Sequence, residues 1–303
     1  MTMPTPLRAG DRVALAATAR KVSPDEIAPF VQLLEGQGYD VLLPDGLFAS
    51  DNQMAGTDEH RAAFLQSLLD DGSVRAIFCA RGGYGTVRIV DRLDFNRFMQ
   101  SPKWIVGYSD ATVLHSCLNR LGCCSLHATM PIDITTQADF ASMAATSMLD
   151  ALAGRNTDCT VEPHNLNRPG YAEAEVVGGN LSILYSLSGT PTAPDTRGKI
   201  LLIEDLDEYL YHIDRMMLNL RRSGALSEIK GLIVGGMTDM HDNTVPFGLT
   251  AEEIVLRAVA DYNYPVLFGA PYGHIKTANR AIVLGKKIAL KVAKTEKSCI
   301  FAL

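Results

Sequence analysis

Short apolar runs alternate with amphipathic segments through the first half of the chain. Apolar positions with helical spacing begin at Pro24 and again at Thr57, and apolar runs of a strand's length lie on either side of these segments. Such alternation is typical of a parallel sheet whose faces are covered by helices. We therefore expect an amino-terminal α/β domain with a parallel sheet flanked by helices, whose strands include residues 13–16, 41–43, 76–78 and 105–106.

The second half of the chain repeats this kind of pattern and adds a different ending. Strands are predicted at 199–203 and 232–234, and helices at 211–222 and from Thr250 onward. Near the end, two apolar runs flank Gly285-Lys286-Lys287, which predicts a β-hairpin formed by residues 281–284 and 288–292.

Between the two halves, from about residue 154 to 170, the chain contains Arg, Asn, Pro and His without periodicity. A stretch of this kind indicates a connection between domains. We expect an α/β domain at 1–155, a linker at 156–172, and a smaller carboxy-terminal α/β domain with the hairpin at 173–303.

Composition narrows the class of partner. The chain has 303 residues, is 47% hydrophobic and carries a formal net charge of −6, so it lacks the basic surface that nucleic acid or an anionic membrane requires. No apolar stretch approaches the ~20 residues of a membrane helix, and the amino terminus does not resemble a signal peptide. We expect a cytoplasmic protein that acts on a small molecule or a peptide.

Cysteine and histidine spacings give no metal site. The six cysteines occur without a C-x-x-C pair, which disfavours a zinc ribbon and a thioredoxin-like redox site, and we expect them to be small buried apolar residues. The sequence contains no H-E-x-x-H motif. We therefore assign no metal.

The tetrad Gly107-Tyr108-Ser109-Asp110 holds the candidate nucleophile. It follows the apolar run 104–106 and precedes a helical pattern that begins near Ala111. A serine at a strand-to-helix turn exposes its hydroxyl above the sheet edge, and the amide of the next residue, Asp110, can point at an oxyanion. The tetrad departs from G-x-S-x-G because Ala111 replaces the second glycine, and a serine at this position also suits a helix N-cap.

A second loop, Arg81-Gly82-Gly83-Tyr84-Gly85, follows the strand at 76–78 and should meet the same sheet edge. Its spacing does not match the dinucleotide fingerprint G-x-G-x-x-G. Its glycines could cradle a phosphate, supply the Gly83 amide as a second oxyanion donor, or serve only a tight turn. The spacing leaves these alternatives open.

Two further positions suit a base and the acid that orients it. Glu204 ends the predicted strand 199–203, and His274 follows the strand 266–268 in a loop rich in glycine and proline. Residues in loops at strand ends carry function more often than residues in the core do. The other histidines that we weighed, His60, His115 and His212, fall within helical patterns and are expected to be structural or surface residues.

Taken together, these motifs resemble the LD-carboxypeptidase family of serine peptidases, which includes muramoyltetrapeptide carboxypeptidases and microcin C self-immunity peptidases. The resemblance covers nearly the whole chain. It rests on the two glycine-containing motifs at 81–85 and 107–110, on Glu204-Asp205 with Glu208, Tyr211 and Asp214-Arg215-Met216, and on Gly273-His274.

The resemblance implies a Ser-His-Glu triad of Ser109, His274 and Glu204, with the oxyanion held by the amides of Gly83 and Asp110. It implies hydrolysis of the terminal D-alanine from muropeptide tetrapeptides in cell-wall recycling, through an acyl-enzyme and without metal or organic cofactor. It also implies a homodimer with the site between two domains. Arg81 and Tyr84 are candidate substrate contacts by position, and either could instead pack the turn.

One departure concerns His127-Ala128-Thr129-Met130-Pro131, where many relatives carry His-Gly-Pro, so the pocket wall could differ here. Two rival functions stay open. The microcin-type branch of the family cleaves peptidyl or aminoacyl nucleotides, but the one tryptophan, Trp104, lies in a predicted buried strand and offers no platform for adenine. A non-catalytic ligand-binding protein has no need for the combination of Ser109, Glu204 and His274.

Overall fold

The first half of the chain builds a six-stranded sheet. In a computed structural model that describes residues 1–275 and 278–303, the strand order is β11-β5-β4-β3-β1-β2. All neighbouring pairs are parallel except β11 with β5. This confirms the expected parallel sheet. Its strands are β1 (Arg12–Ala16), β2 (Asp40–Leu42), β3 (Val74–Cys79), β4 (Trp104–Gly107), β5 (Ser125–His127) and β11 (Ile282–Leu284).

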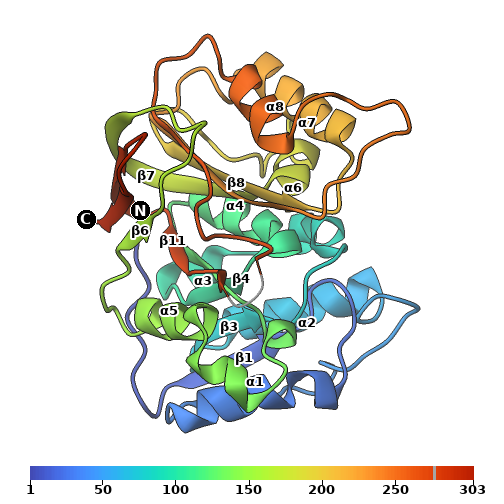
Figure 1. Cartoon of the computed structure of the whole chain (residues 1–303). Helices are drawn as coiled ribbons and strands as arrows, with labels where there is room; N and C mark the ends of the chain where they lie inside the picture. The colour runs from blue at the N-terminus through green and yellow to red at the C-terminus, as the bar shows by residue number, and fades with distance from the viewer. Residues whose placement is uncertain (276–277) are drawn as a thin grey trace.

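Helices flank this sheet, as the sequence pattern predicts (Figure 1). The start of the first helix is fixed by a capping box, in which the Ser23 side chain accepts from the Glu26 amide and Glu26 accepts in return from the Ser23 amide. The helices are α1 (Pro24–Gly36), α2 (Asp58–Asp70), α3 (Asn96–Gln100), α4 (Thr112–Arg120) and α5 (Met143–Leu152). Short 3₁₀ turns occupy Thr86–Arg88, Val90–Arg92, Ser109–Ala111, Pro131–Asp133 and Gln137–Ala141.

The second half builds a seven-stranded mixed sheet in the order β10-β9-β8-β7-β12-β13-β6. Strands β7 to β10 pair in parallel, whereas β12 pairs antiparallel with β7 and β13, and β13 with β6. The strands are β6 (Cys159–Val161), β7 (Gly170–Asn180), β8 (Ile200–Leu206), β9 (Gly231–Thr238), β10 (Val266–Leu267), β12 (Lys287–Val292) and β13 (Ser298–Ala302). Its helices are α6 (Leu181–Ser186), α7 (Leu210–Arg222) and α8 (Ala251–Ala258).

The hairpin predicted from residues 281–284 and 288–292 is wrong in its placement. β11 pairs with β5 in the first sheet, whereas β12 joins the second sheet beside β7. The glycine turn at Gly285 therefore carries the chain from one sheet to the other. The antiparallel hairpin of this half is instead β12 with β13. Two adjacent apolar runs are compatible with a hairpin and equally with two strands that join different sheets. The sequence pattern alone does not say which strand pairs with which.

The boundaries 1–155, 156–172 and 173–303 stay predictions. Within 156–172, β6 and the first residues of β7 already pair in the second sheet. The two sheets meet through α4 and β7, where the Asn180 amide donates to the Thr112 hydroxyl at 3.0 Å. This contact joins the carboxyl end of β7 to the start of α4, the helix that follows β4 and Ser109.

Each sheet buries its own apolar core. The first core joins β1, β3 and β4 to α1 and α2, and the second lies between the strands β7 to β10 and the helices α7 and α8. A third cluster fills the opposite face of the second sheet and includes Leu202 of β8, Leu290 of β12 and Ile300 of β13. The burial of these apolar side chains stabilises both sheets and so holds in place the strand ends that carry the site. Among the described helices, none has the length and apolar character required to cross a bilayer.

Candidate active site

Three loops converge on the carboxyl edge of the first sheet. Strands β1, β3 and β4 are neighbours in the order β4-β3-β1, so the loops that follow them lie side by side. The loops after β1, β3 and β4 hold Arg20, the glycine motif 81–85 and Ser109 respectively. In open parallel sheets the carboxyl edge is where ligands bind. The structure therefore brings together the two glycine-containing motifs that the sequence singled out.

Ser109 occupies a strained turn between β4 and α4. Its φ is 60°, in the left-handed region that residues other than glycine seldom adopt. The Gly107 carbonyl at the end of β4 accepts a hydrogen bond from His115 Nε2 at 2.9 Å, which holds the end of the strand in place. A serine kept in such a conformation by its surroundings is typical of a nucleophile presented at a sharp strand-to-helix turn.

The glycine motif packs directly onto this serine. A Cβ atom built on Gly82 would lie 2.9 Å from both Cβ and Oγ of Ser109, so no larger residue fits without displacement. The Asp110 carboxylate also ties the two loops together, because it accepts from the Thr86 amide at 2.9 Å. Burial raises the pKa of Asp110. The predicted oxyanion donors, the amides of Gly83 and Asp110, belong to these two adjoining loops.

Glu204 and His274 form a buried pair at the edge of the second sheet. Glu204 lies near the end of β8, and its side chain has no exposed surface. Its Oε2 accepts from His274 Nδ1 at 2.6 Å and from the His274 amide at 3.2 Å. Burial by itself would lower the pKa of His274, but the hydrogen bond and the negative charge of Glu204 outweigh it, so the pKa is raised above 6.5. The pair has the arrangement of a base and the carboxylate that orients it.

Gly273 allows this approach. Its φ is 93°, and a Cβ atom at this position would lie 2.3 Å from Glu204 Oε2. On the other side, the Thr238 hydroxyl of β9 donates to the His274 carbonyl at 3.0 Å. The histidine is thus fixed through its ring, its amide and its carbonyl.

The two halves of the site meet at Tyr108. The Tyr108 ring centroid lies 4.7 Å from that of His274, and Tyr108 is the chain neighbour of Ser109. Its hydroxyl donates to Asp133 Oδ1 at 3.2 Å. The hydrogen bond that the structure gives to the His274 ring is the one to Glu204, so a bond from Nε2 to the Ser109 hydroxyl belongs to the proposal below.

The side chains of Tyr108 and Asp133 have contacts at the site that the sequence pattern does not predict. Asp133 also accepts from the Met130 amide at 2.8 Å and thereby fixes the segment that departs from the His-Gly-Pro pattern. Burial raises the pKa of Asp133. An acid two residues beyond a proline gave no sequence signal for this contact. Tyr108, by contrast, lies inside the tetrad and could have been considered from its position alone.

Two buried histidines border the site without taking part in the pair. Both ring nitrogens of His115 have partners, Ser125 Oγ and the Gly107 carbonyl, as expected for a structural histidine. His127 packs 5.9 Å from the Tyr108 ring, and burial lowers its pKa to about 4. His127 therefore stays neutral near pH 7. In the described part of the chain, no group of three or more His, Cys, Asp or Glu side chains is arranged to hold a metal ion.

The candidate substrate contacts lie on the rim of this edge. Arg81 Nη1 forms an ion pair with Glu26 Oε1 at 3.0 Å. Tyr84 is 47% exposed. Both assignments stay predictions.

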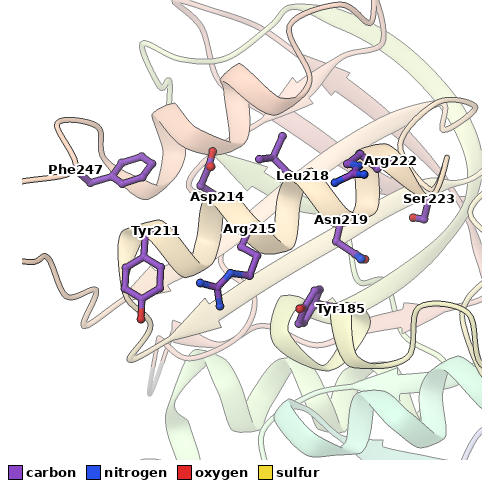
Figure 2. Close-up of a pocket in the computed structure, with 9 residues that line it drawn as sticks. All are labelled: Tyr185, Tyr211, Asp214, Arg215, Leu218, Asn219, Arg222, Ser223 and Phe247. Carbon is purple, nitrogen blue, oxygen red and sulfur yellow. The ribbon is translucent and has the colours of Figure 1, made fainter.

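A separate groove runs along α7 (Figure 2). It has a volume of about 800 Å³ and includes Tyr211, Asp214 and Arg215 from the family motif. The Arg215 guanidinium lies 5.3 Å from the centre of the Tyr211 ring, which is the geometry of a cation–π contact. None of the predicted triad or oxyanion residues lines this groove.

Comparison with known proteins shows the family to which the chain is similar. Residues 13–128 match the family model described as the LD-carboxypeptidase N-terminal domain, and residues 173–290 match that of the LD-carboxypeptidase C-terminal domain. A probable murein peptide carboxypeptidase of Bacillus subtilis is 35% identical, over 96% of this chain and 92% of that protein. The murein tetrapeptide carboxypeptidase of Pseudomonas aeruginosa is 31% identical, over 92% of this chain and 93% of that protein.

Solved structures with the same fold include two kinds of protein. The muramoyltetrapeptide carboxypeptidase of Oxalobacter formigenes superposes with a TM-score of 0.87 at 25% identity, over 96% of this chain and 99% of that one. The microcin C7 self-immunity protein MccF, solved with aspartyl sulfamoyl adenosine, has a TM-score of 0.86 at 19% identity, over 100% of this chain and 99% of that one. The second likeness shows the fold alone.

Proposed function

Because the chain belongs to the LD-carboxypeptidase family and is thus a hydrolase of the serine carboxypeptidase type, we propose that it removes the terminal D-alanine from muropeptide tetrapeptides. The observation that carries the proposal is the buried hydrogen bond of His274 to Glu204, with the His274 ring packed on Tyr108, the chain neighbour of the strained Ser109. The names of the relatives support a substrate derived from the cell wall.

In the proposed first half-reaction, Ser109 Oγ attacks the carbonyl carbon between the diamino acid and D-alanine. His274 Nε2 takes the hydroxyl proton, and the negative charge moves to the carbonyl oxygen, where the amides of Gly83 and Asp110 donate to it. The C–N bond then breaks, and the nitrogen of D-alanine leaves with the proton from His274. The product is an ester of the peptide with Ser109.

In the second half-reaction, His274 accepts a proton from water as the water oxygen attacks the ester carbonyl carbon. The bond from this carbon to Ser109 Oγ then breaks, His274 returns the proton to Oγ, and the tripeptide leaves with a free carboxylate. Glu204 keeps the proton of the neutral imidazole on Nδ1 and so leaves Nε2 free to accept. It also stabilises the imidazolium that forms in each step, which agrees with the raised pKa of His274. These steps require no cofactor.

Hydrolysis of peptidyl or aminoacyl nucleotides is the rival activity, since solved structures of the self-immunity protein share this fold. The environment of Trp104 favours the muropeptide substrate. This residue is buried in β4, and its Nε1 donates to the Thr5 carbonyl at 3.0 Å, so its ring cannot stack on a nucleobase.

Two further parts of the proposal concern the cell and the assembly. We place the enzyme in the cytoplasm, where recycled wall fragments would be trimmed, and we expect a homodimer. Light scattering of the purified protein tests the second point directly, because a mass of one chain, 32.8 kDa, would contradict it.

The experiment that tests the reaction is release of D-alanine from L-Ala-γ-D-Glu-diamino-acid-D-Ala, followed by mass spectrometry. We expect release by the wild type on a lysine or a diaminopimelate tetrapeptide, and loss of at least about 10⁴-fold in kcat for Ser109→Ala. A wild type that is inactive on both peptides but cleaves an aminoacyl-adenylate analogue would support the rival activity. Undiminished release by Ser109→Ala would remove Ser109 as the nucleophile.

A further inference from the structure

Removal of a single terminal residue requires a group that recognises the free carboxylate of that residue. A cation that donates two parallel hydrogen bonds suits a carboxylate best, and arginine is the side chain with that geometry. Arg61 donates to the Thr18 and Gly85 carbonyls at this edge, but it is fully buried and paired with Asp58. Two further arginines, neither of them fully buried, reach the carboxyl edge of the first sheet near Ser109. They are Arg20, in the loop after β1, and Arg81, in the loop after β3.

The two arginines differ in their partners. Arg81 is already paired with Glu26, and Arg88 of the same loop region is paired with Asp58. Arg20 is exposed, and within residues 1–275 and 278–303 no carboxylate lies within ion-pair distance of it. Of these arginines, Arg20 is therefore the one that is available to an anionic ligand.

The side chain of Arg20 lies across the glycine motif. A Cβ atom built on Gly83 would lie 2.3 Å from Cδ and 2.8 Å from Cγ of Arg20, so the aliphatic part of the side chain rests on the Gly83 backbone. The preceding residue, Gly82, is the one in contact with the Ser109 hydroxyl. The chain of contacts from the nucleophile to Arg20 thus passes through two consecutive residues.

This placement agrees with the size of the substrate. In an extended terminal residue the carboxylate carbon lies about 3.5 Å beyond the scissile carbonyl carbon. The Cα atoms of Gly82 and Gly83 are about 3.8 Å apart, as in any trans peptide. A terminal carboxylate beside the scissile bond at Ser109 is therefore within the reach of a guanidinium whose stem rests on Gly83.

We propose that Arg20 binds the terminal carboxylate of the substrate and so restricts the enzyme to the last residue of a peptide. This inference rests on the proposed carboxypeptidase function. The guanidinium pairs with the carboxylate of the bound D-alanine and holds the scissile carbonyl above Ser109. A peptide that continues beyond this residue, or one that ends in an amide, lacks the charge that Arg20 recognises.

The test compares two substrates in steady-state kinetics. One is the tetrapeptide that ends in D-alanine, and the other is the same peptide ending in D-alaninamide. For Arg20→Gln we expect KM for the acid to rise at least tenfold, while kcat/KM for the amide changes less than threefold. The preference of the wild type for the acid should therefore fall at least tenfold. Arg20→Lys, which keeps the charge, should recover part of this preference.

Lys21→Gln is the matched control. It removes the same charge from the neighbouring residue, whose amino group donates to Ser50 Oγ, and should leave the acid-to-amide ratio unchanged. Melting curves for every variant check folding, and because Arg20 is exposed we expect them to coincide. If the wild type is active and its acid-to-amide ratio is unchanged in Arg20→Gln and in Arg20→Lys, the inference about Arg20 is overturned and the proposed function stands. A wild type inactive on both substrates would overturn the proposed function and the inference with it.

Discussion

At the edge of the first sheet Ser109 is held by backbone shape and close contact, whereas at the edge of the second sheet His274 is held by a buried charge. The serine has a φ of 60° and touches Gly82. The histidine has ordinary contacts except for Glu204, whose fully buried carboxylate accepts two of its hydrogen bonds. One part of the site is therefore steric and the other electrostatic.

This difference predicts how each part should fail. A steric contact does not change when a proton binds, so damage at the serine should be equal at every pH. The position and the pKa of His274 depend on the charge of Glu204, so damage there should vary with pH. Four experiments test the contrast, beginning with the one for which we expect the largest effect.

Replacement of the buried carboxylate, Glu204→Gln, should lower kcat/KM about 10³-fold near neutral pH, because the imidazolium loses its counter-charge. Oε2 of Glu204 accepts from both the ring and the amide of His274, so the amide oxygen of glutamine should take its place and keep the same tautomer. The loss of kcat/KM then reports the missing charge of Glu204 and not a change in the orientation of the His274 ring. D-alanine release over a range of pH is the measurement.

The neighbouring acid gives the control for this variant. Asp205 is also buried, and burial together with the charge of Glu204 raises its pKa to about 7, but its carboxylate accepts from Asn180 Nδ2 and the Ser182 amide and makes no hydrogen bond to His274. We expect Asp205→Asn to cost far less activity than Glu204→Gln. Equal losses would mean that general negative charge, and not a specific partner for His274, is what matters.

The steric part is tested by Gly82→Ala. The added Cβ would lie 2.9 Å from Cβ and Oγ of Ser109, and displacement of the nucleophile by a fraction of an ångström should lower kcat/KM about 10²-fold. The φ of Gly82 is not positive, so alanine adds no backbone strain of its own. Kinetics at several pH values should show the same ratio to the wild type throughout.

Gly72→Ala is the matched control, since a Cβ there meets nothing within 4 Å. Its activity should equal that of the wild type. If the Gly82→Ala defect grew or shrank strongly with pH, the contact with Ser109 would not be purely steric.

The pH profile of the wild type gives the third, smaller effect. His274 must be neutral to accept the serine proton. Burial lowers its pKa, but Glu204, with smaller contributions from Asp205 and Asp133, raises it by more, so the pKa lies above 6.5. Below that pKa, kcat/KM should fall about tenfold per pH unit, and above it the rate should level off. Without the charge in Glu204→Gln, burial prevails and the acid limb should move to lower pH. An acid limb that stays in place would argue against His274 as its source.

The sequence predicted the electrostatic part less completely than the steric part. The strand-to-helix turn at Ser109 and the glycine motif after β3 are local features, and the parallel sheet covered by helices follows from the alternation of strands and helices. The pairing of Glu204 with His274 joins residues 70 positions apart. Strand-end position made both residues candidates, and their joint role came from the resemblance to a family.

What the sequence could not predict was how strands are shared between the two sheets. β11 and β12 are separated by a short turn, yet they belong to different sheets. The contacts of Tyr108 with His274 and Asp133 also depend on this assembly, because they join three segments that meet only in the folded chain. The local sequence pattern carries no information about contacts between segments that are far apart in the chain.

The smallest effect is expected on the rim, where neither steric contact nor buried charge operates. Arg81 pairs with Glu26 in a solvent-accessible position, and such pairs contribute about 0–1 kcal/mol. Arg81→Gln should therefore change the free energy of unfolding by less than about 1 kcal/mol, measured by urea denaturation. As Glu26 still caps α1 through Ser23, the helix start should persist.

If Arg81 only borders the substrate, KM should rise no more than about threefold, well below the change expected for Arg20→Gln. A larger rise in KM with unchanged stability would make Arg81 the carboxylate-binding residue and place Arg20 on the rim in its stead.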